Sequence, residues 1–274
     1  SIWSSAFRGC SSLTEITIPD RVTSIGDSAF YSCTSLTEIT IPDSVTNIEG
    51  FVFTDTPWLT AKQEENPLVI LNGTLIDGTT CTGSVTIPDG VTSIAGGAFD
   101  SCTGLTAIAI PKSVTSIGDS AFYRCTSLTE ITIPDSVTSM GDYVFDGCTG
   151  LTKVTMPDSI TSIGDYAFRS CTGLTEITIP DSVTSIGDYA FCDCTGLTKI
   201  VIPDSVTSIG DSAFDNCDNL IIYGHTGSFA ETYAKEHGIQ FAAYTFGDLD
   251  NSGKVDSTDI FYTMYYVANV AVGN

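Results

Sequence analysis

The sequence predicts an α/β repeat solenoid, with a parallel sheet along one face and short helical turns along another. The chain repeats itself every 23 residues, so aligned positions hold the same residue type. One column is phenylalanine, at Phe7, Phe30, Phe99, Phe122, Phe145, Phe168, Phe191 and Phe214. A period of about 20 to 29 residues is typical of a solenoid. Since no single repeat can bury its own apolar side chains, neighbouring repeats must stack to form a continuous core.

Each repeat is expected to begin with a strand. In one of them Leu128, Ile131 and Ile133 alternate with polar residues, which predicts a strand with one buried face. Pro134 ends this strand, because proline lacks the N–H that a sheet ladder needs. Residues 137–140 then form a second short extended segment.

The remainder of the repeat is expected to be a helical turn. Asp142 follows Gly141, and its carboxylate can cap free backbone N–H groups where such a turn begins. Phe145 and Cys148 are three residues apart, a spacing that places both side chains on one side of a helical turn. The phenylalanine and cysteine columns are therefore predicted to fill the core.

The 23-residue pattern resembles the leucine-rich repeats of the bacterial surface type often called BspA-like. The resemblance covers residues 1–243, through ten consecutive registers. It implies a solenoid with a parallel sheet on one face and short helical turns on the other. It does not imply an activity, because one fold can carry many different sites.

Composition narrows the choice of partners. The chain has 10 basic and 33 acidic residues and a net charge of −23, which argues against nucleic acid and anionic membranes. No apolar run is long enough to predict a membrane span. Residues 1–7 align with residues 24–30, so the sequence begins within a repeat. We therefore expect further sequence before Ser1, including any export signal.

Ten cysteines suggest a disulfide scaffold, but their spacing indicates a buried column instead. A free cysteine behaves as a small hydrophobic residue. Neighbouring coils should lie about 4.8 Å apart, within the disulfide window of about 4.4 to 6.8 Å between Cα atoms, so pairing stays possible. Stacked side chains make the torsion awkward, so we expect reduced thiols. Cys192 lies outside the column and is expected to be exposed.

The repeat is interrupted at residues 54–86. A polar segment, residues 61–66, is expected to be helical, and Asn72-Gly73 predicts a two-residue hairpin turn. We expect the hairpin and Trp58 to protrude from one side. Two interpretations are open: an alternative structural coil, or a protrusion that carries binding.

The solenoid is expected to end in a cap formed by residues 227–243. Residues 228–237 predict a helix that Ser228 caps and Gly238 ends. Such an atypical terminal element covers the open end of a repeat core. The sequence therefore predicts one solenoid domain over residues 1–243 and a separate module over residues 244–274.

The C-terminal module predicts a calcium loop followed by a helix. Hard oxygen ligands at EF-hand spacing can surround one calcium ion, and the expected ligands are Asp248, Asp250, Ser252, the Lys254 backbone carbonyl, Asp256 and Asp259. The segment resembles one half of a dockerin. That resemblance implies that Ser257 and Thr258 contact a cohesin-type scaffold protein, although dockerins carry two such segments. An acidic linker is the alternative.

These features predict a non-catalytic extracellular binding or adhesion protein. Its repeat surface would meet a protein or glycan partner, and its dockerin-type module would attach it to a larger, cellulosome-like assembly. Tyr143, Tyr166 and Tyr189 share one column and could form an exposed aromatic strip for a partner, or could simply cover the turns below. The alternative function is a passive structural spacer. No catalytic residues are predicted, because no nucleophile, base and metal set converges.

Overall fold

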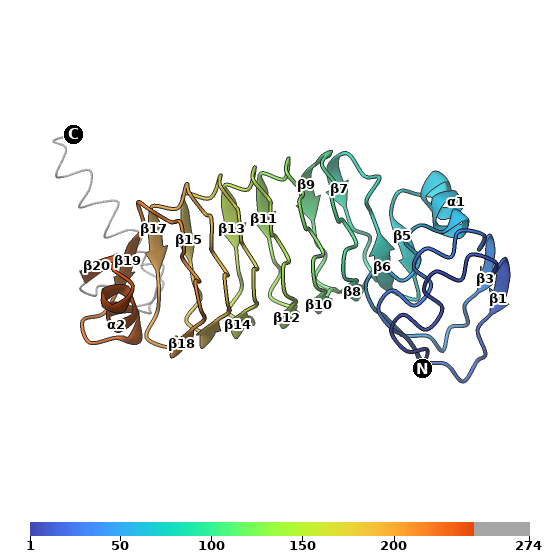
Figure 1. The fold of residues 1–274 in the computed structure, drawn as a ribbon, viewed down its shortest axis with the longest axis horizontal. Coiled ribbons are helices and arrows are strands. Elements are labelled where there is room, and N and C mark those ends of the chain that lie inside the picture. Colours follow the sequence, from blue (N-terminus) through green and yellow to red (C-terminus); the bar gives the residue numbers. More distant parts are fainter. Residues whose placement is uncertain (244–274) are drawn as a thin grey trace.

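The computed structural model describes residues 1–243, and these form an elongated stack of parallel coils (Figure 1). The first face of the stack is made by one strand from each regular coil. These strands are β1 (Glu15–Thr17), β3 (Glu38–Thr40), β7 (Gly83–Thr86), β9 (Leu105–Ala109), β11 (Glu130–Thr132), β13 (Lys153–Thr155), β15 (Glu176–Thr178), β17 (Lys199–Val201) and β19 (Ile221–Gly224). They pair in parallel within three short sheets, in the orders β1-β3, β13-β11-β9-β7 and β15-β17-β19-β20, where β20 is the last strand (Gln240–Ala243).

A second face carries shorter strands, one from each coil. They are β2 (Ser24–Ile25), β4 (Asn47–Ile48), β6 (Thr74–Asp77), β8 (Ser93–Ile94), β10 (Ser116–Ile117), β12 (Ser139–Met140), β14 (Ser162–Ile163), β16 (Ser185–Ile186) and β18 (Ser208–Ile209). The pairing register joins residues 23 apart, as in Ser116 with Ser139. The predicted parallel solenoid is therefore confirmed.

The third side differs in detail from the sequence prediction, because tight turns replace the expected helical turns. Phe145 donates its N–H to Ala167 O of the next coil at 2.8 Å, and Cys148 donates its N–H back to Phe145 O at 3.0 Å. Tyr143 has a φ of 59°, which a helix cannot contain. Alternate N–H groups thus bond to the neighbouring coil, and the turn still places Phe145 and Cys148 on the inside.

The aspartate column links coils rather than capping a turn within its own coil. Asp119 Oδ1 accepts the Asp142 N–H at 3.0 Å, and Asp142 Oδ1 accepts the Asp165 N–H at 2.9 Å. The same contact continues to Asp188 and Asp211, at 2.8 Å in each case. Burial raises the pKa of Asp142, and the neighbouring carboxylates raise it further, against the backbone N–H that it accepts. Each carboxylate therefore caps a backbone N–H, but one of the next coil rather than of its own turn.

The phenylalanine column forms a continuous stack inside the coils. Phe145 is fully buried, and its ring centroid lies 5.5 Å from that of Phe122 and 5.3 Å from that of Phe168. The rings are nearly parallel, with interplanar angles of 8° and 17°. Offset stacking of this kind adds to the hydrophobic stabilisation of each ring. The predicted inward column is confirmed.

The cysteines are free thiols, and those from Cys33 onward are buried. Cys148 Sγ lies 3.0 Å from Phe122 O, and Cys171 Sγ lies 3.1 Å from Phe145 O, so each thiol donates to the preceding coil. Burial raises the pKa of Cys148 to about 12. The expectation of an exposed Cys192 is wrong: the residue is only 8% exposed, and burial raises the pKa of its thiol to about 11.

The variant repeat is built into the stack. Helix α1 (Pro57–Glu65) is capped by Thr56, whose side chain accepts the Leu59 N–H. It contains the segment expected to be helical except for Asn66, which is its extended C-cap. Strand β5 (Val69–Leu71) forms the predicted antiparallel hairpin with β6, and Asn72 and Gly73 both have positive φ. The hairpin does not protrude as expected, because β6 pairs with β8 inside the second sheet.

Trp58 was also expected to protrude, and this is wrong. It is 7% exposed and packs against Phe53 with ring centroids 4.6 Å apart. Its ring fills space at the end of the first phenylalanine stack. The core is divided at this point into one cluster from Ile18 to Val69 and another from Leu75 to Ala234. The hairpin turn lies between them, and Figure 1 shows that the first coils turn away from the line of the later ones.

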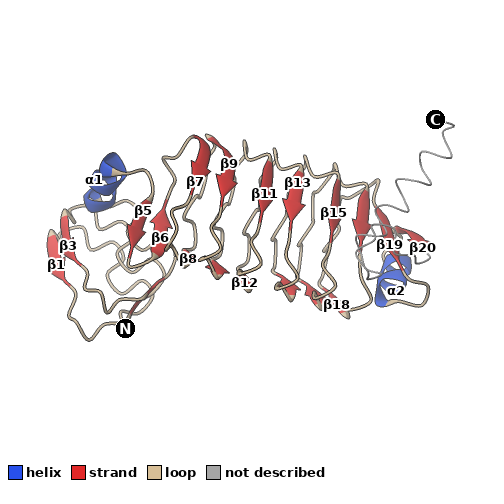
Figure 2. Cartoon of the chain, turned by 180° about the vertical axis from the view of Figure 1, so that it is seen from behind, coloured by secondary structure: helices blue, strands red, loops and turns tan. Residues whose placement is uncertain are grey.

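The C-terminal end is covered by α2 (Phe229–Glu236) and β20 (Gln240–Ala243), seen from behind in Figure 2. Ser228 accepts the Glu231 N–H at 3.2 Å, which confirms the predicted helix cap. Tyr233 meets the last ring of the stack, Phe214, edge-on at 6.0 Å. Within residues 1–243, neither helix has the length and apolar composition to cross a bilayer. The division into domains remains a prediction.

We expect Phe145→Ala to lower the free energy of unfolding by about 3 to 5 kcal/mol, because it removes a fully buried ring from between two others. Chemical denaturation followed by circular dichroism measures the change. Thr132→Ala, on the exposed side of β11, is the matched control and should change stability by less than about 0.5 kcal/mol. A loss from Phe145→Ala as small as that of the control would contradict the inward column.

The native thiols from Cys33 to Cys217 should resist alkylation by iodoacetamide at neutral pH. Burial raises their pKa values, and the thiolate is the reactive form. Mass spectrometry should find Cys10, which is exposed, as the one modified cysteine in the native chain. Unfolding in guanidinium should expose all ten. Rapid native modification of Cys192 would show that its side chain faces solvent after all.

Candidate binding surfaces

Three tyrosines form an aromatic strip on the turn side of the solenoid. Tyr143 and Tyr166 stack with centroids 4.6 Å apart, and Tyr166 and Tyr189 stack at 4.9 Å, with interplanar angles of 5° and 10°. The side chains are half-buried because each covers part of the next. Partial burial raises the pKa of Tyr166, and the neighbouring tyrosines raise it further. The structure thus brings together the three residues that the sequence aligned.

The backbone of this column is left-handed in every coil that holds a tyrosine, with φ of 59°, 56° and 54°. A left-handed residue other than glycine costs about 1 to 2 kcal/mol. Serine takes the same place in other coils, at Ser28, Ser120 and Ser212, also with positive φ. The turn therefore forms without an aromatic ring, so the tyrosines are not needed to build it.

One basic residue extends the strip. The Arg169 guanidinium lies 5.0 Å from the centroid of Tyr166, within the range of a cation–π contact. Arg169 also forms two hydrogen bonds with Asp146, from Nε at 3.1 Å and from Nη2 at 2.7 Å. The Asp146 contact raises the pKa of Arg169 and holds its side chain across two coils. A positive group is thus fixed beside the aromatic surface.

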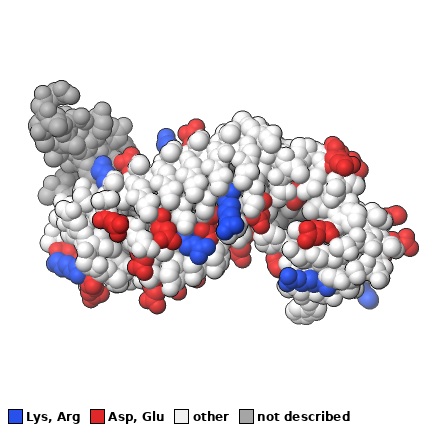
Figure 3. Space-filling view, turned by 45° about the horizontal axis from the view of Figure 1, so that its top comes forward, with Lys and Arg blue, Asp and Glu red and all other residues white. Residues whose placement is uncertain are grey.

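The first sheet presents a polar face. The threonine column Thr17, Thr40, Thr132 and Thr155 is exposed there, with Thr178 half-buried. Glu130 pairs in register with Lys153, and Glu176 with Lys199, so opposite charges lie on adjacent strands. Acidic groups outnumber basic ones on the surface seen in Figure 3, as the net charge requires.

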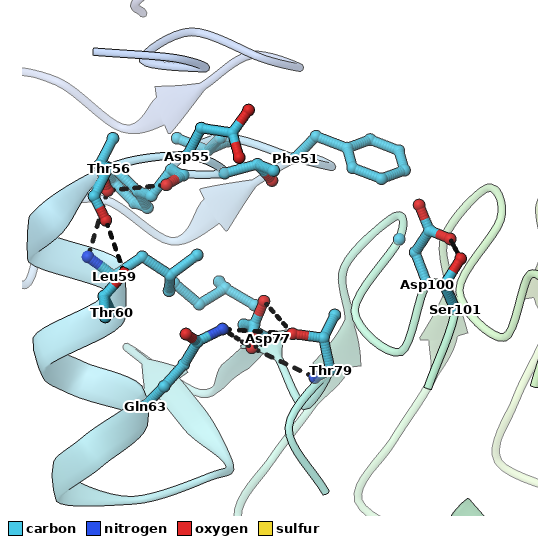
Figure 4. Close-up of a pocket in the computed structure, with 15 residues that line it drawn as sticks. Phe51, Asp55, Thr56, Leu59, Thr60, Gln63, Asp77, Thr79, Asp100 and Ser101 are labelled. Carbon is cyan, nitrogen blue, oxygen red and sulfur yellow. Dashed lines mark hydrogen bonds between the residues drawn. The ribbon is translucent and has the colours of Figure 1, made fainter. Parts of the chain in front are cut away.

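A hollow of about 290 Å³ lies at the variant repeat, lined by residues from α1, β6 and the turns of the coils on either side (Figure 4). Asp77 is its most buried acid, at 7% exposed. Asp77 Oδ1 accepts from Gln63 Nε2 at 2.8 Å and from the Thr79 N–H at 3.2 Å. Burial raises the pKa of Asp77, while these hydrogen bonds oppose the rise.

Sequence reasoning did not find this hollow. The only sign of it in the sequence is that the variant coil is two residues shorter than the next coil. Leu75 is six residues before Cys81, whereas Ile94, which aligns with Leu75, is eight residues before Cys102. The shortened coil cannot be recognised as a site from its residue types, because threonine and aspartate occur in every turn. The expected calcium ligands and the residues Ser257 and Thr258 lie outside the described residues. Within residues 1–243, no three His, Cys, Asp or Glu side chains are grouped to hold a metal ion.

The stacked coils, the parallel sheet and the inward columns define a bacterial-type leucine-rich repeat protein. Residues 1–102 and 76–174 match the family model described as the BspA type leucine rich repeat region, and the chain belongs to this family. No curated protein matches the chain.

Three solved structures illustrate the likeness. A leucine-rich repeat protein from Eubacterium ventriosum is 22% identical, with 78% of this chain and 80% of that one covered and a TM-score of 0.50. One from Bacteroides ovatus is 28% identical, with coverage of 85% and 66% and a TM-score of 0.41. A leucine rich cell surface protein from Faecalibacterium prausnitzii is 28% identical, with coverage of 85% and 79% and a TM-score of 0.32. The Eubacterium structure supports the fold alone.

Proposed function

We propose that this chain is a non-catalytic extracellular protein that binds a protein or glycan partner through its repeat surface. The observation that carries the proposal is the strip of Tyr143, Tyr166 and Tyr189. The tyrosines occupy a turn position that serine occupies in other coils, and the Arg169 side chain lies beside Tyr166. Aromatic and arginine side chains are enriched where proteins bind their partners. Membership of the BspA type family supports a surface role.

We further propose that residues 244–274 attach the protein to a larger assembly as a dockerin-type module. The support is the sequence spacing of oxygen ligands at Asp248, Asp250, Ser252, Asp256 and Asp259, with a glycine at the sharp turn. The Lys254 carbonyl would complete the set. A single segment of this kind would take up calcium, whereas stable cohesin binding through Ser257 and Thr258 would require a second segment. The alternative function is a passive spacer.

The aromatic strip is tested with the triple variant Tyr143→Ala/Tyr166→Ala/Tyr189→Ala. A screen of polysaccharides and host glycoproteins supplies the ligand, and surface plasmon resonance measures its affinity. We expect the triple variant to bind at least about tenfold more weakly, or about 1.4 kcal/mol, because it removes the stacking surface.

The matched control is Ser28→Ala/Ser120→Ala/Ser212→Ala, which changes the same column in other coils and should keep wild-type affinity. Unchanged binding by the tyrosine variant would remove the strip from the site. A screen that finds no ligand for the wild-type chain would favour the spacer function instead.

The calcium loop is tested by isothermal titration. We expect the chain to bind one calcium ion at concentrations up to millimolar, the weak end of the range for extracellular modules, and Asp248→Ala/Asp259→Ala to lose it. The control Asp135→Ala/Asp158→Ala removes the same charge from two turns of the solenoid and should bind calcium as the wild type does. Equal uptake by the loop variant, or none by the wild type, would favour the acidic linker.

A further inference from the structure

The hollow at the variant repeat exists because one coil is two residues short. Strand pairing aligns Leu75 with Ile94. Gly78 donates its N–H to Ala98 O, as Phe99 donates its N–H to Ala121 O, so Gly78 occupies the phenylalanine position. The coil therefore lacks counterparts of Gly97 and of the alanine that follows it. It lacks the turn that the next coil makes from Ala95 to Ala98, and Gly78 supplies no ring.

The coils on either side meet across the shortened turn. A Cβ atom added to Gly50 would lie 2.9 Å from Gly96 O, so these two backbones are in contact. A Cβ atom added to Gly97 would lie 2.2 Å from the Phe51 ring, which therefore lies directly over this glycine. Beyond these contacts the missing turn leaves a cavity, and Phe51 forms part of its wall (Figure 4).

The lining combines negative charge with apolar surface. Asp55, Asp77 and Asp100 all line the cavity, together with apolar atoms of Phe51 and Leu59. Among the described residues that line it, none is basic. The acids are held by neutral donors: Ser32 Oγ donates to Asp55 Oδ2 at 3.1 Å, and Ser101 Oγ donates to Asp100 Oδ1 at 2.8 Å.

Asp77 has acceptor capacity to spare. Its Oδ1 accepts from Gln63 and from the Thr79 backbone, but its Oδ2 has only the Thr79 hydroxyl, at 3.3 Å. A buried carboxylate is costly unless a positive group pairs with it. The protein holds this carboxylate with neutral donors alone, from Gln63 and Thr79.

We propose that this cavity binds an organic cation, an ammonium or guanidinium group at the end of a short aliphatic chain. The Asp77 carboxylate would accept its N–H donors, and Asp55 and Asp100 would add negative charge to the lining. Phe51 and Leu59 would cover the aliphatic part. The Phe51 ring adds a cation–π contact, and the net charge of −23 draws cations toward the surface. At about 290 Å³ the cavity is at the small end of ligand pockets, which suits one side chain or one small amine. This site is independent of the tyrosine strip and of the calcium loop.

The cation could be a free amine or the side chain of lysine or arginine on another polypeptide. Titrations followed by ¹H–¹⁵N NMR distinguish these sources with three probes. They are butylammonium, a lysine tripeptide with blocked ends, and the same tripeptide with glutamine in place of lysine. Methyl glucoside is added as a neutral polyhydroxyl probe. We expect the ammonium probes to shift the Gln63 side-chain amide and the Thr79 backbone amide, and the neutral probes to leave them unchanged.

Two variants test the carboxylates. Asp77→Asn and Asp100→Asn should each weaken binding of the ammonium probes by about tenfold, because the first removes a charge-assisted hydrogen bond and the second removes a negative charge from the lining. Asp43→Asn makes the same charge change at an exposed turn and should bind as the wild type does. Because Asp100 is nearer the surface than Asp77, its variant keeps the test valid if Asp77→Asn unfolds.

The pattern of amide shifts decides between the outcomes. Binding of both ammonium probes supports a site for the cation itself, and binding of the lysine tripeptide alone supports the site with a polypeptide as its source. The proposal is overturned if no ammonium probe shifts these amides, if methyl glucoside shifts them instead, or if Asp100→Asn and Asp43→Asn bind equally well.

Discussion

Coil-to-coil registry is the constraint on which the rest of this structure depends. Every 23 residues the chain returns to the same position in the next coil. The backbones of neighbouring coils are hydrogen-bonded there, as when Phe145 donates its N–H to Ala167 O. Identical side chains are thereby brought into contact, which explains the phenylalanine stack, the thiols that donate to the preceding coil and the aspartates that accept from the next. A residue in such an array is stabilised mainly by its neighbours one repeat away.

The same registry makes a departure from the pattern consequential. Gly78 stands where a phenylalanine ring would continue the stack, and the coils on either side respond by bringing Gly50 and Gly96 into contact. Trp58 packs against Phe53 and closes the first stack. The hollow of about 290 Å³ lies where the shortened coil lacks two residues.

The tyrosine strip and the cavity follow from this arrangement in different ways. The tyrosine strip repeats a side chain at constant spacing, so an extended partner could meet the same chemistry in three consecutive coils. The cavity lies at the shortened coil, and acidic residues from three different coils line it. One surface thus suits recognition of a long or repetitive partner, whereas the other suits one small positive group.

The sequence by itself determined the solenoid, its inward columns, the hairpin at Asn72-Gly73 and the helix capped by Ser228, because periodicity and local turn chemistry report directly on these features. It did not determine the tight turns, because the spacing from Phe145 to Cys148 fits a helical turn as well as a tight turn. The difference arises because alternate N–H groups bond to the neighbouring coil instead of within the turn. Nor could it place Cys192 or Trp58 inside, or join Asp55, Asp77 and Asp100 around one cavity. Those outcomes depend on which coil lies next to which, and only the tertiary structure decides that.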